Sequence, residues 1–116
     1  MVHREGRTLM RLPNAPEIAG QGPGAKASGS VFHNPAMAGS RTRSVLLLRY
    51  VIEAGLLGDG AIYALDGLSA TGLRARRWLN ELPPDLAKRI RVTIVDLDPS
   101  ALAWATGSHE EFPPAH

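Results

Sequence analysis

Apolar residues gather after Ser44, and their spacing predicts alternating helices and strands. A near-continuous apolar run over 61–65 is typical of a strand that is covered on both faces of a parallel sheet. The expected elements, in order, are a helix from Ser40 to Gly55, a strand over 61–65, a helix over 71–82, a strand over 91–95 and a helix from Asp98 to Gly107. This order predicts a βαβ unit whose two strands lie parallel.

Capping residues mark the ends of these helices. Ser40 is a suitable N-cap for the first helix, and Gly55 is a suitable residue just beyond its end. Two prolines at 83–84 stop the second helix, and a short turn of helix is expected after them. Asp98, followed by a proline, is a typical N-cap for the last helix.

The core is expected to come from the apolar faces of these helices. We assign to it the apolar side chains at 45–48, 51 and 52 and the two tryptophans, Trp78 and Trp104. Arg76 and Arg77 fall on the other face of the second helix and are interpreted as surface residues.

Glycine and proline punctuate the first 30 residues, so we expect a flexible basic arm there, with a short strand possible within 7–12. Residues 31–107 would form the folded domain, and 108–116 a disordered tail. Two parallel strands are too few for a complete open α/β sheet. The fold class we predict is therefore α/β, the N-terminal part of a larger domain.

Composition and charge indicate in which compartment the protein works and what kind of partner it binds. There is no cysteine, no run long enough to span a membrane and no apolar signal-peptide core, which is compatible with a cytoplasmic protein. Residues 1–49 hold seven Arg or Lys and two Glu, whereas 50–116 hold six Arg or Lys and nine Asp or Glu. A basic N-terminal part suits a nucleic-acid partner, although it also suits a solvated arm.

The loop from Asp66 to Gly72 is the first candidate site, because it follows the strand over 61–65 and the carboxyl ends of parallel strands bind ligands in α/β folds. Its glycines permit tight turns, and Ser69 offers a hydroxyl near a helix N-terminus. The spacing is not G-x-G-x-x-G, which counts against a nicotinamide-dinucleotide site. The same residues also suit an ordinary β–α turn.

Asp96 strengthens this prediction, because it ends the next strand and can accept hydrogen bonds from both hydroxyls of a ribose. It could instead cap the helix that follows. Asp98 is the better cap, which leaves Asp96 for a ligand.

Arg41 and Arg74 lie near helix N-termini, where a cation is unfavourable, and this suggests pairing with a ligand carboxylate. Solvent-exposed charge is the alternative. The four histidines show no metal-ligand spacing and are interpreted as incidental: His3, His33, His109 and His116.

Two segments together resemble the tRNA (guanine(26)-N(2))-dimethyltransferase family. Residues 31–41 read VFHNPAMAGSR, similar to the family signature phenylalanine–tyrosine–asparagine–proline–x–methionine followed by asparagine–arginine–aspartate. Residues 65–74 read LDGLSATGLR, similar to the family's LDALSATGIR loop. His33 stands where tyrosine is common, and Ser40 and Thr42 replace the residues that flank the family arginine.

The resemblance implies a Rossmann-like class I methyltransferase fold that binds S-adenosylmethionine and dimethylates one guanine of a tRNA. It assigns Arg41 to the methionine end of the cofactor and Asp96 to its ribose. The cofactor-binding residues it implies are Arg41, Asp66, Ser69, Gly72, Arg74 and Asp96.

The family's catalytic Asp-Pro-Phe-type motif and its C-terminal tRNA-binding domain have no counterpart in these 116 residues, so we expect no turnover from this chain alone. The alternative function is a non-catalytic basic RNA-binding module. Oligomeric state is not predicted.

Overall fold

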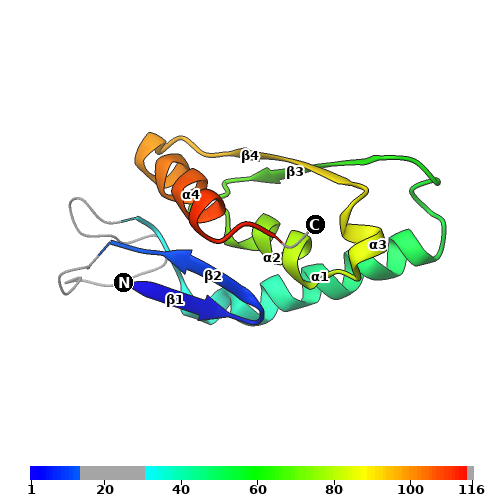
Figure 1. Cartoon of the computed structure of the whole chain (residues 1–116), viewed down its shortest axis with the longest axis horizontal. Coiled ribbons are helices and arrows are strands. Elements are labelled where there is room, and N and C mark those ends of the chain that lie inside the picture. Colours follow the sequence, from blue (N-terminus) through cyan, green and yellow to red (C-terminus); the bar gives the residue numbers. More distant parts are fainter. Residues whose placement is uncertain (14–30, 115–116) are drawn as a thin grey trace.

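A computed structural model describes residues 1–13 and 31–114 (Figure 1). The segments 14–30, expected as part of a flexible arm, and 115–116 lie outside the described residues. The elements are β1 (Val2–Glu5), β2 (Thr8–Arg11), the 3₁₀ turn η1 (Pro35–Met37), α1 (Ala38–Glu53), β3 (Ile62–Gly67), α2 (Leu73–Glu81), α3 (Pro84–Ala87), β4 (Ile90–Val95) and α4 (Pro99–Glu111).

The expected βαβ unit is present. β3 and β4 pair in parallel over their whole length, with Asp66 opposite Ile94. The α/β class and the partial Rossmann-like arrangement are therefore confirmed. Within the described ranges this sheet has only two strands, so both of its edges are free.

The main core lies between one face of this sheet and the helices α1 and α2. Trp78 of α2 is 9% exposed and packs there with Val45 and Ile52 of α1 and with Ile62 and Ile90 of the sheet. A second cluster joins Met10, Leu12, Val31, Leu73 and Ala101, and Trp104 packs against it. Both tryptophans are core residues, as predicted.

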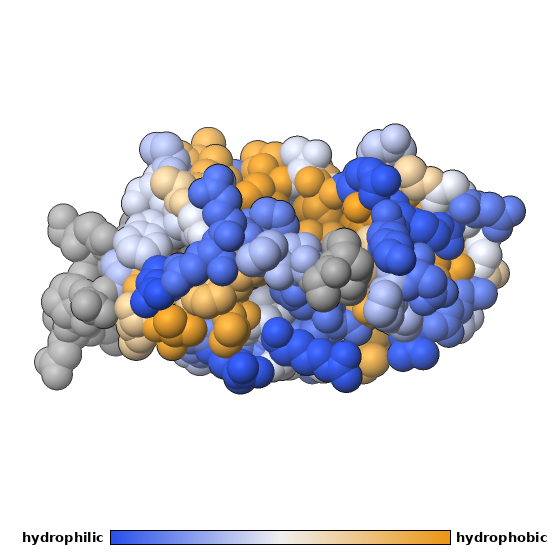
Figure 2. Space-filling model, in the orientation of Figure 1, coloured by the Kyte–Doolittle hydropathy of each residue, from blue (hydrophilic) through white to orange (hydrophobic). Residues whose placement is uncertain are grey.

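The other face of the sheet is largely uncovered. Tyr63 is 83% exposed and Leu65 67%, and Figure 2 shows apolar residues along the part of the surface where β3 and β4 run. Leu46 and Leu47, which we expected to pack on the sheet, are also exposed. The apolar run over 61–65 therefore belongs to a strand that is buried on one face only.

Two of the predicted helix ends are confirmed by the capping that the structure shows. Asp98 caps α4 by accepting a hydrogen bond from the Ser100 amide at 2.9 Å, and Gly55 follows α1 with a φ of 75°. α1 begins at Ala38 rather than at Ser40, because the turn that Asn34 opens leads directly into it. α4 runs past Gly107 to Glu111, so the first four residues of the segment expected as a disordered tail are helical.

The N-terminal segment is also more ordered than expected. β1 and β2 form an antiparallel hairpin in which Thr8 and Met10 are fully buried. The Arg11 amide donates to Ser108 Oγ of α4 at 2.9 Å, and the Arg11 side chain pairs with Glu111. Residues 1–13 are therefore part of the folded body, which corrects the expectation of a flexible arm there and agrees with the short strand expected within 7–12.

A buried ion network joins this hairpin to the helices. Glu5 of β1 accepts from Arg41 Nε and Nη2 of α1, both at 2.7 Å, and from Arg77 Nη1 of α2 at 3.1 Å. Arg77 also holds Glu81 through two bonds of 2.7 Å. Burial raises the pKa of Glu5, but the hydrogen bonds and charges of the two arginines outweigh it and hold that pKa below its usual value.

Arg76 and Arg77 are each only 4% exposed, so their assignment to the surface was wrong. Arg76 donates to the carbonyl oxygens of Leu9 and Phe112, and thereby ties α2 to β2 and to the end of α4. The hairpin provides partners for both guanidinium groups, and this is what keeps them buried.

Replacing Arg77 with methionine should lower the free energy of unfolding by about 3 kcal/mol, because it leaves the buried Glu5 and Glu81 carboxylates short of a partner. Denaturant unfolding followed by circular dichroism measures the loss. Arg49→Met is the matched control, because Arg49 and Glu53 form an exposed i,i+4 pair and the change should stay within about 0.5 kcal/mol. Equal losses in the two variants would contradict the structural role of the network.

Candidate functional site

A cavity of about 180 Å³ lies at the carboxyl end of β3. It is lined by the loop from β3 to α2, by the segment that leads into η1 and by the first turns of α1 and α2. Four of the predicted site residues line it together: Arg41, Asp66, Ser69 and Arg74. The other two do not line it: Gly72 is the last residue of the loop, and Asp96 holds the loop through a hydrogen bond.

The loop has a strained backbone. Leu68 and Ala70 adopt φ values of 55° and 47°, in the left-handed region that costs a non-glycine residue roughly 1–2 kcal/mol. Gly72 follows with a φ of 70°, and an added Cβ would lie 3.1 Å from Ala105 Cβ, so glycine is needed there both for its conformation and for its size. Such strain persists where the surroundings enforce it, and it is concentrated at functional sites.

Asp96 holds the loop in this shape. Its Oδ2 accepts from the Ala70 amide and its Oδ1 from the Asp98 amide, both at 2.8 Å. We had expected the Asp98 cap to leave the Asp96 carboxylate unused, but both oxygens already have a protein partner. Each carboxylate oxygen can accept more than one hydrogen bond, so the side chain still has capacity for a ligand.

Three unpaired buried atoms belong to residues that line the cavity. Among the described residues, four buried side-chain atoms lack a hydrogen-bond partner, and three of them belong to residues that line it: His33 Nε2, Asp66 Oδ2 and Ser69 Oγ. Buried polar atoms are normally paired, so a group of unpaired ones calls for a partner from outside the protein. A small polar ligand could supply hydrogen bonds to all three.

Asp66 is 6% exposed at the N-terminus of α2. Burial raises the pKa of its carboxyl, and the Ala75 amide and the Arg74 charge oppose this rise. The α2 N-cap is Gly72, which has no side chain to cap the helix, so Asp66 does part of that work from the end of β3. Its second oxygen remains available to accept from a cationic group.

Arg41 and Arg74 differ in whether a carboxylate of the protein already pairs with them. Arg41 is 8% exposed and has two nitrogens bonded to Glu5, while Nη2 also reaches the Asn34 carbonyl at 3.1 Å. Arg74 donates only to Ser40, at its carbonyl oxygen and its hydroxyl, and pairs with no carboxylate in the described parts of the chain. Of the two, Arg74 is the cation that retains charge for a ligand anion.

His33 is a cavity residue that the sequence did not point to. Its ring packs edge-on against His3, with centroids 4.7 Å apart. Burial, with the charges of His3 and Arg41, lowers its pKa to about 4, so it is neutral at physiological pH. The one available signal was its position before Asn34 in the segment that precedes η1.

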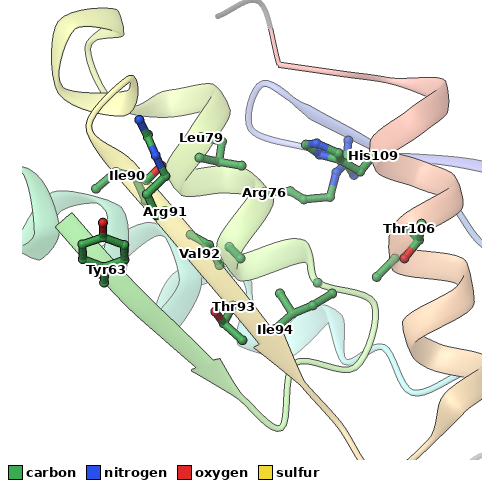
Figure 3. A pocket seen from close by; sticks show the side chains of 13 residues that line it. Tyr63, Arg76, Leu79, Ile90, Arg91, Val92, Thr93, Ile94, Thr106 and His109 are labelled. Carbon is green, nitrogen blue, oxygen red and sulfur yellow. The ribbon is translucent and has the colours of Figure 1, made fainter. Parts of the chain in front are cut away.

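A larger cavity of about 550 Å³ lies beside the free edge of β4, between α2 and α4 (Figure 3). Apolar side chains such as Leu79, Val92 and Ile94 form much of its wall, and Arg76 and His109 lie near each other on its far side. Gly72 is the one predicted site residue among its lining residues. We place the site in the smaller cavity, because the three unpaired polar atoms lie there.

The described part of the chain has neither a metal-binding cluster nor a membrane-spanning helix. No group of three or more His, Cys, Asp or Glu side chains there could hold a metal ion. No described helix is both long enough and apolar enough to cross a membrane.

Comparison with known proteins gives one family. Residues 6–106 match the model of the family described as N2,N2-dimethylguanosine tRNA methyltransferase. The chain is 36% identical over 81 residues to the tRNA (guanine(26)-N(2))-dimethyltransferase of Pyrobaculum calidifontis, a match that covers 70% of this chain. The same match covers 20% of the relative, so the chain spans about a fifth of that protein's length. No solved structure matches this chain.

Asp66→Asn should raise the free energy of unfolding at pH 7, because a carboxyl whose folded-state pKa is raised costs stability when ionised. The gain should shrink as the pH falls through the folded-state pKa, and it should vanish only below the ordinary value, where Asp66 is protonated in both states. Denaturant unfolding at pH 7 and at pH 4 measures it. Asp59→Asn, at an exposed position, should change little at either pH, and a loss of stability in Asp66→Asn would contradict the prediction.

Proposed function

The chain belongs to the N2,N2-dimethylguanosine tRNA methyltransferase family, and on this basis we propose that it forms the cofactor-binding part of an S-adenosylmethionine-dependent enzyme that dimethylates the N2 amine of a tRNA guanine, at position 26 as in the named relative. The membership agrees with the resemblance of residues 31–41 and 65–74. The proposal implies a tRNA partner and a cytoplasmic location, where tRNA is used.

The three unpaired polar atoms in the cavity carry this proposal. The amino-acid end of S-adenosylmethionine has one ammonium and one carboxylate group. Asp66 Oδ2 is a buried acceptor suited to the ammonium, and Arg74 is a cation without a carboxylate partner among the described residues. The cavity of about 180 Å³ suits the amino-acid end rather than the whole cofactor.

The ribose and the base would lie outside the cavity, along the end of β4. Asp96 would accept from the ribose hydroxyls while it keeps its bonds to the loop. Leu97, the next residue, is 96% exposed and offers an apolar surface beside that carboxylate. Ser69 and Gly72 would shape the loop that the cofactor approaches, and Arg41 would form the cavity wall near the methionine end.

When bound, the cofactor supplies an already activated methyl group, so the chief tasks of the protein are orientation and proton handling. The residues described here can bind and orient the cofactor. No residue among them is assigned to the guanine amine. That task, with most of the tRNA recognition, would fall to parts of the enzyme beyond this fifth of its length.

Calorimetry with S-adenosylhomocysteine tests cofactor binding. The chain should bind it, and Asp96→Ala should weaken binding by tenfold or more through loss of the ribose contact and of the loop anchor. Asp98→Ala is the matched control, since it removes a nearby carboxylate that caps α4 and does not hold the Ala70 amide, and it should retain affinity. Absence of binding, together with salt-sensitive binding of tRNA, would favour the alternative of a basic RNA-binding module.

A methyl-transfer assay tests whether this chain binds the cofactor without carrying the catalytic group. We expect these 116 residues to transfer no methyl group to undermodified tRNA, although they bind the cofactor. A radiolabelled-methyl assay measures transfer, with the longer relative as the positive control. Transfer by the 116-residue chain would contradict the proposal that the catalytic group lies elsewhere.

A further inference from the structure

His33 offers a hydrogen-bonding atom that the fold itself does not use. Its Nε2 is buried and has no partner, although the residue lines the same cavity as Asp66 and Ser69. The ring is held in place by its edge-on contact with His3. Its position is therefore set by packing while its polar atom remains available.

The groups closest to His33 keep its ring neutral. His3 on β1 and Arg41 on α1 both disfavour protonation of the ring, and Glu5 on β1 favours it less strongly. Asp66 on β3 and Arg74 on α2 face the same cavity from the other side. The imidazole is neutral, and the two arginines around it are balanced by the two carboxylates.

Few hydrogen-bond donors on the cavity wall remain free. Arg41 has Nε and Nη2 engaged by Glu5, and both terminal nitrogens of Arg74 donate to Ser40. A ligand carboxylate that pairs with Arg74 would still need donors for its second oxygen. His33 Nε2, carrying the ring proton, and the Ser69 hydroxyl are two buried, unpaired groups that can provide them.

We propose that His33 donates a hydrogen bond from Nε2 to the α-carboxylate of the cofactor, and so makes this site selective for adenosyl ligands that carry a free amino-acid end. The inference deepens the proposed function and rests on it. It gives a direct ligand contact to a residue that the sequence analysis considered incidental. It also explains why the ring nitrogen lies buried without a partner inside the protein.

Two ligands that differ only at the amino-acid end test this. S-adenosylhomocysteine carries the ammonium and the carboxylate, whereas 5′-methylthioadenosine has a methyl group in their place. His33→Ala should weaken S-adenosylhomocysteine about tenfold in calorimetry and leave 5′-methylthioadenosine unchanged. Equal weakening of both ligands would overturn the proposal, because it would mean that His33 only supports the fold.

A pair of amide variants separates the nitrogen atoms. The glutamine amide nitrogen can occupy the place of Nε2, whereas the shorter asparagine amide reaches only the place of Nδ1. His33→Gln should retain most of the affinity for S-adenosylhomocysteine, and His33→Asn should behave as the alanine variant does. Denaturant unfolding of each variant shows whether it is folded. If the alanine variant does not fold, the comparison of the glutamine and asparagine variants still tests the role of Nε2.

The outcomes also distinguish this inference from the proposed function. If the unaltered chain binds S-adenosylhomocysteine and all three variants bind it equally well, the role of His33 is refuted and the cofactor site stands. If the unaltered chain binds neither ligand, the proposed function fails and the inference fails with it.

Discussion

Glu5 is the residue on which the arrangement of the site depends. Its carboxylate joins β1 to α1 through Arg41 and to α2 through Arg77, and Arg77 carries the network on to Glu81. Buried charges are tolerated only when they are paired in good geometry, so each of these side chains constrains where the others can lie. Because Arg41 also lines the cavity, the network that anchors the hairpin positions one wall of the site as well.

The opposite wall is built from a strained loop. Leu68 and Ala70 have left-handed backbone conformations, and Asp96 reaches across from the end of β4 to hold the Ala70 amide. Asp66 and Ser69 then contribute polar atoms that no described residue satisfies. The left-handed conformations and the unsatisfied polar atoms lower the stability of the free protein, which is the usual character of a site shaped for a ligand rather than for folding.

Local patterns were enough to predict most of the elements after residue 35. The turn chemistry at Gly55 and Asp98, the parallel strands and the core positions of both tryptophans follow from patterns of neighbouring residues, and each is present. The N-terminal hairpin was mostly missed because its strands are four residues each and mix charged with apolar side chains. Its stability comes from α2 and α4, more than 60 residues away.

The sequence by itself determined the βαβ order, the family and the acidic residues at the two strand ends, because strand periodicity, capping and the loop motif are local properties. Only the tertiary structure decided which charges are available to a ligand. It paired Arg41 with Glu5, left Arg74 without a carboxylate partner among the described residues, used both oxygens of Asp96 to hold the loop and placed His33 in the cavity. Those outcomes depend on contacts between segments that are far apart in the sequence. Residue type and local spacing do not show which charged side chains will pair with one another in the folded protein.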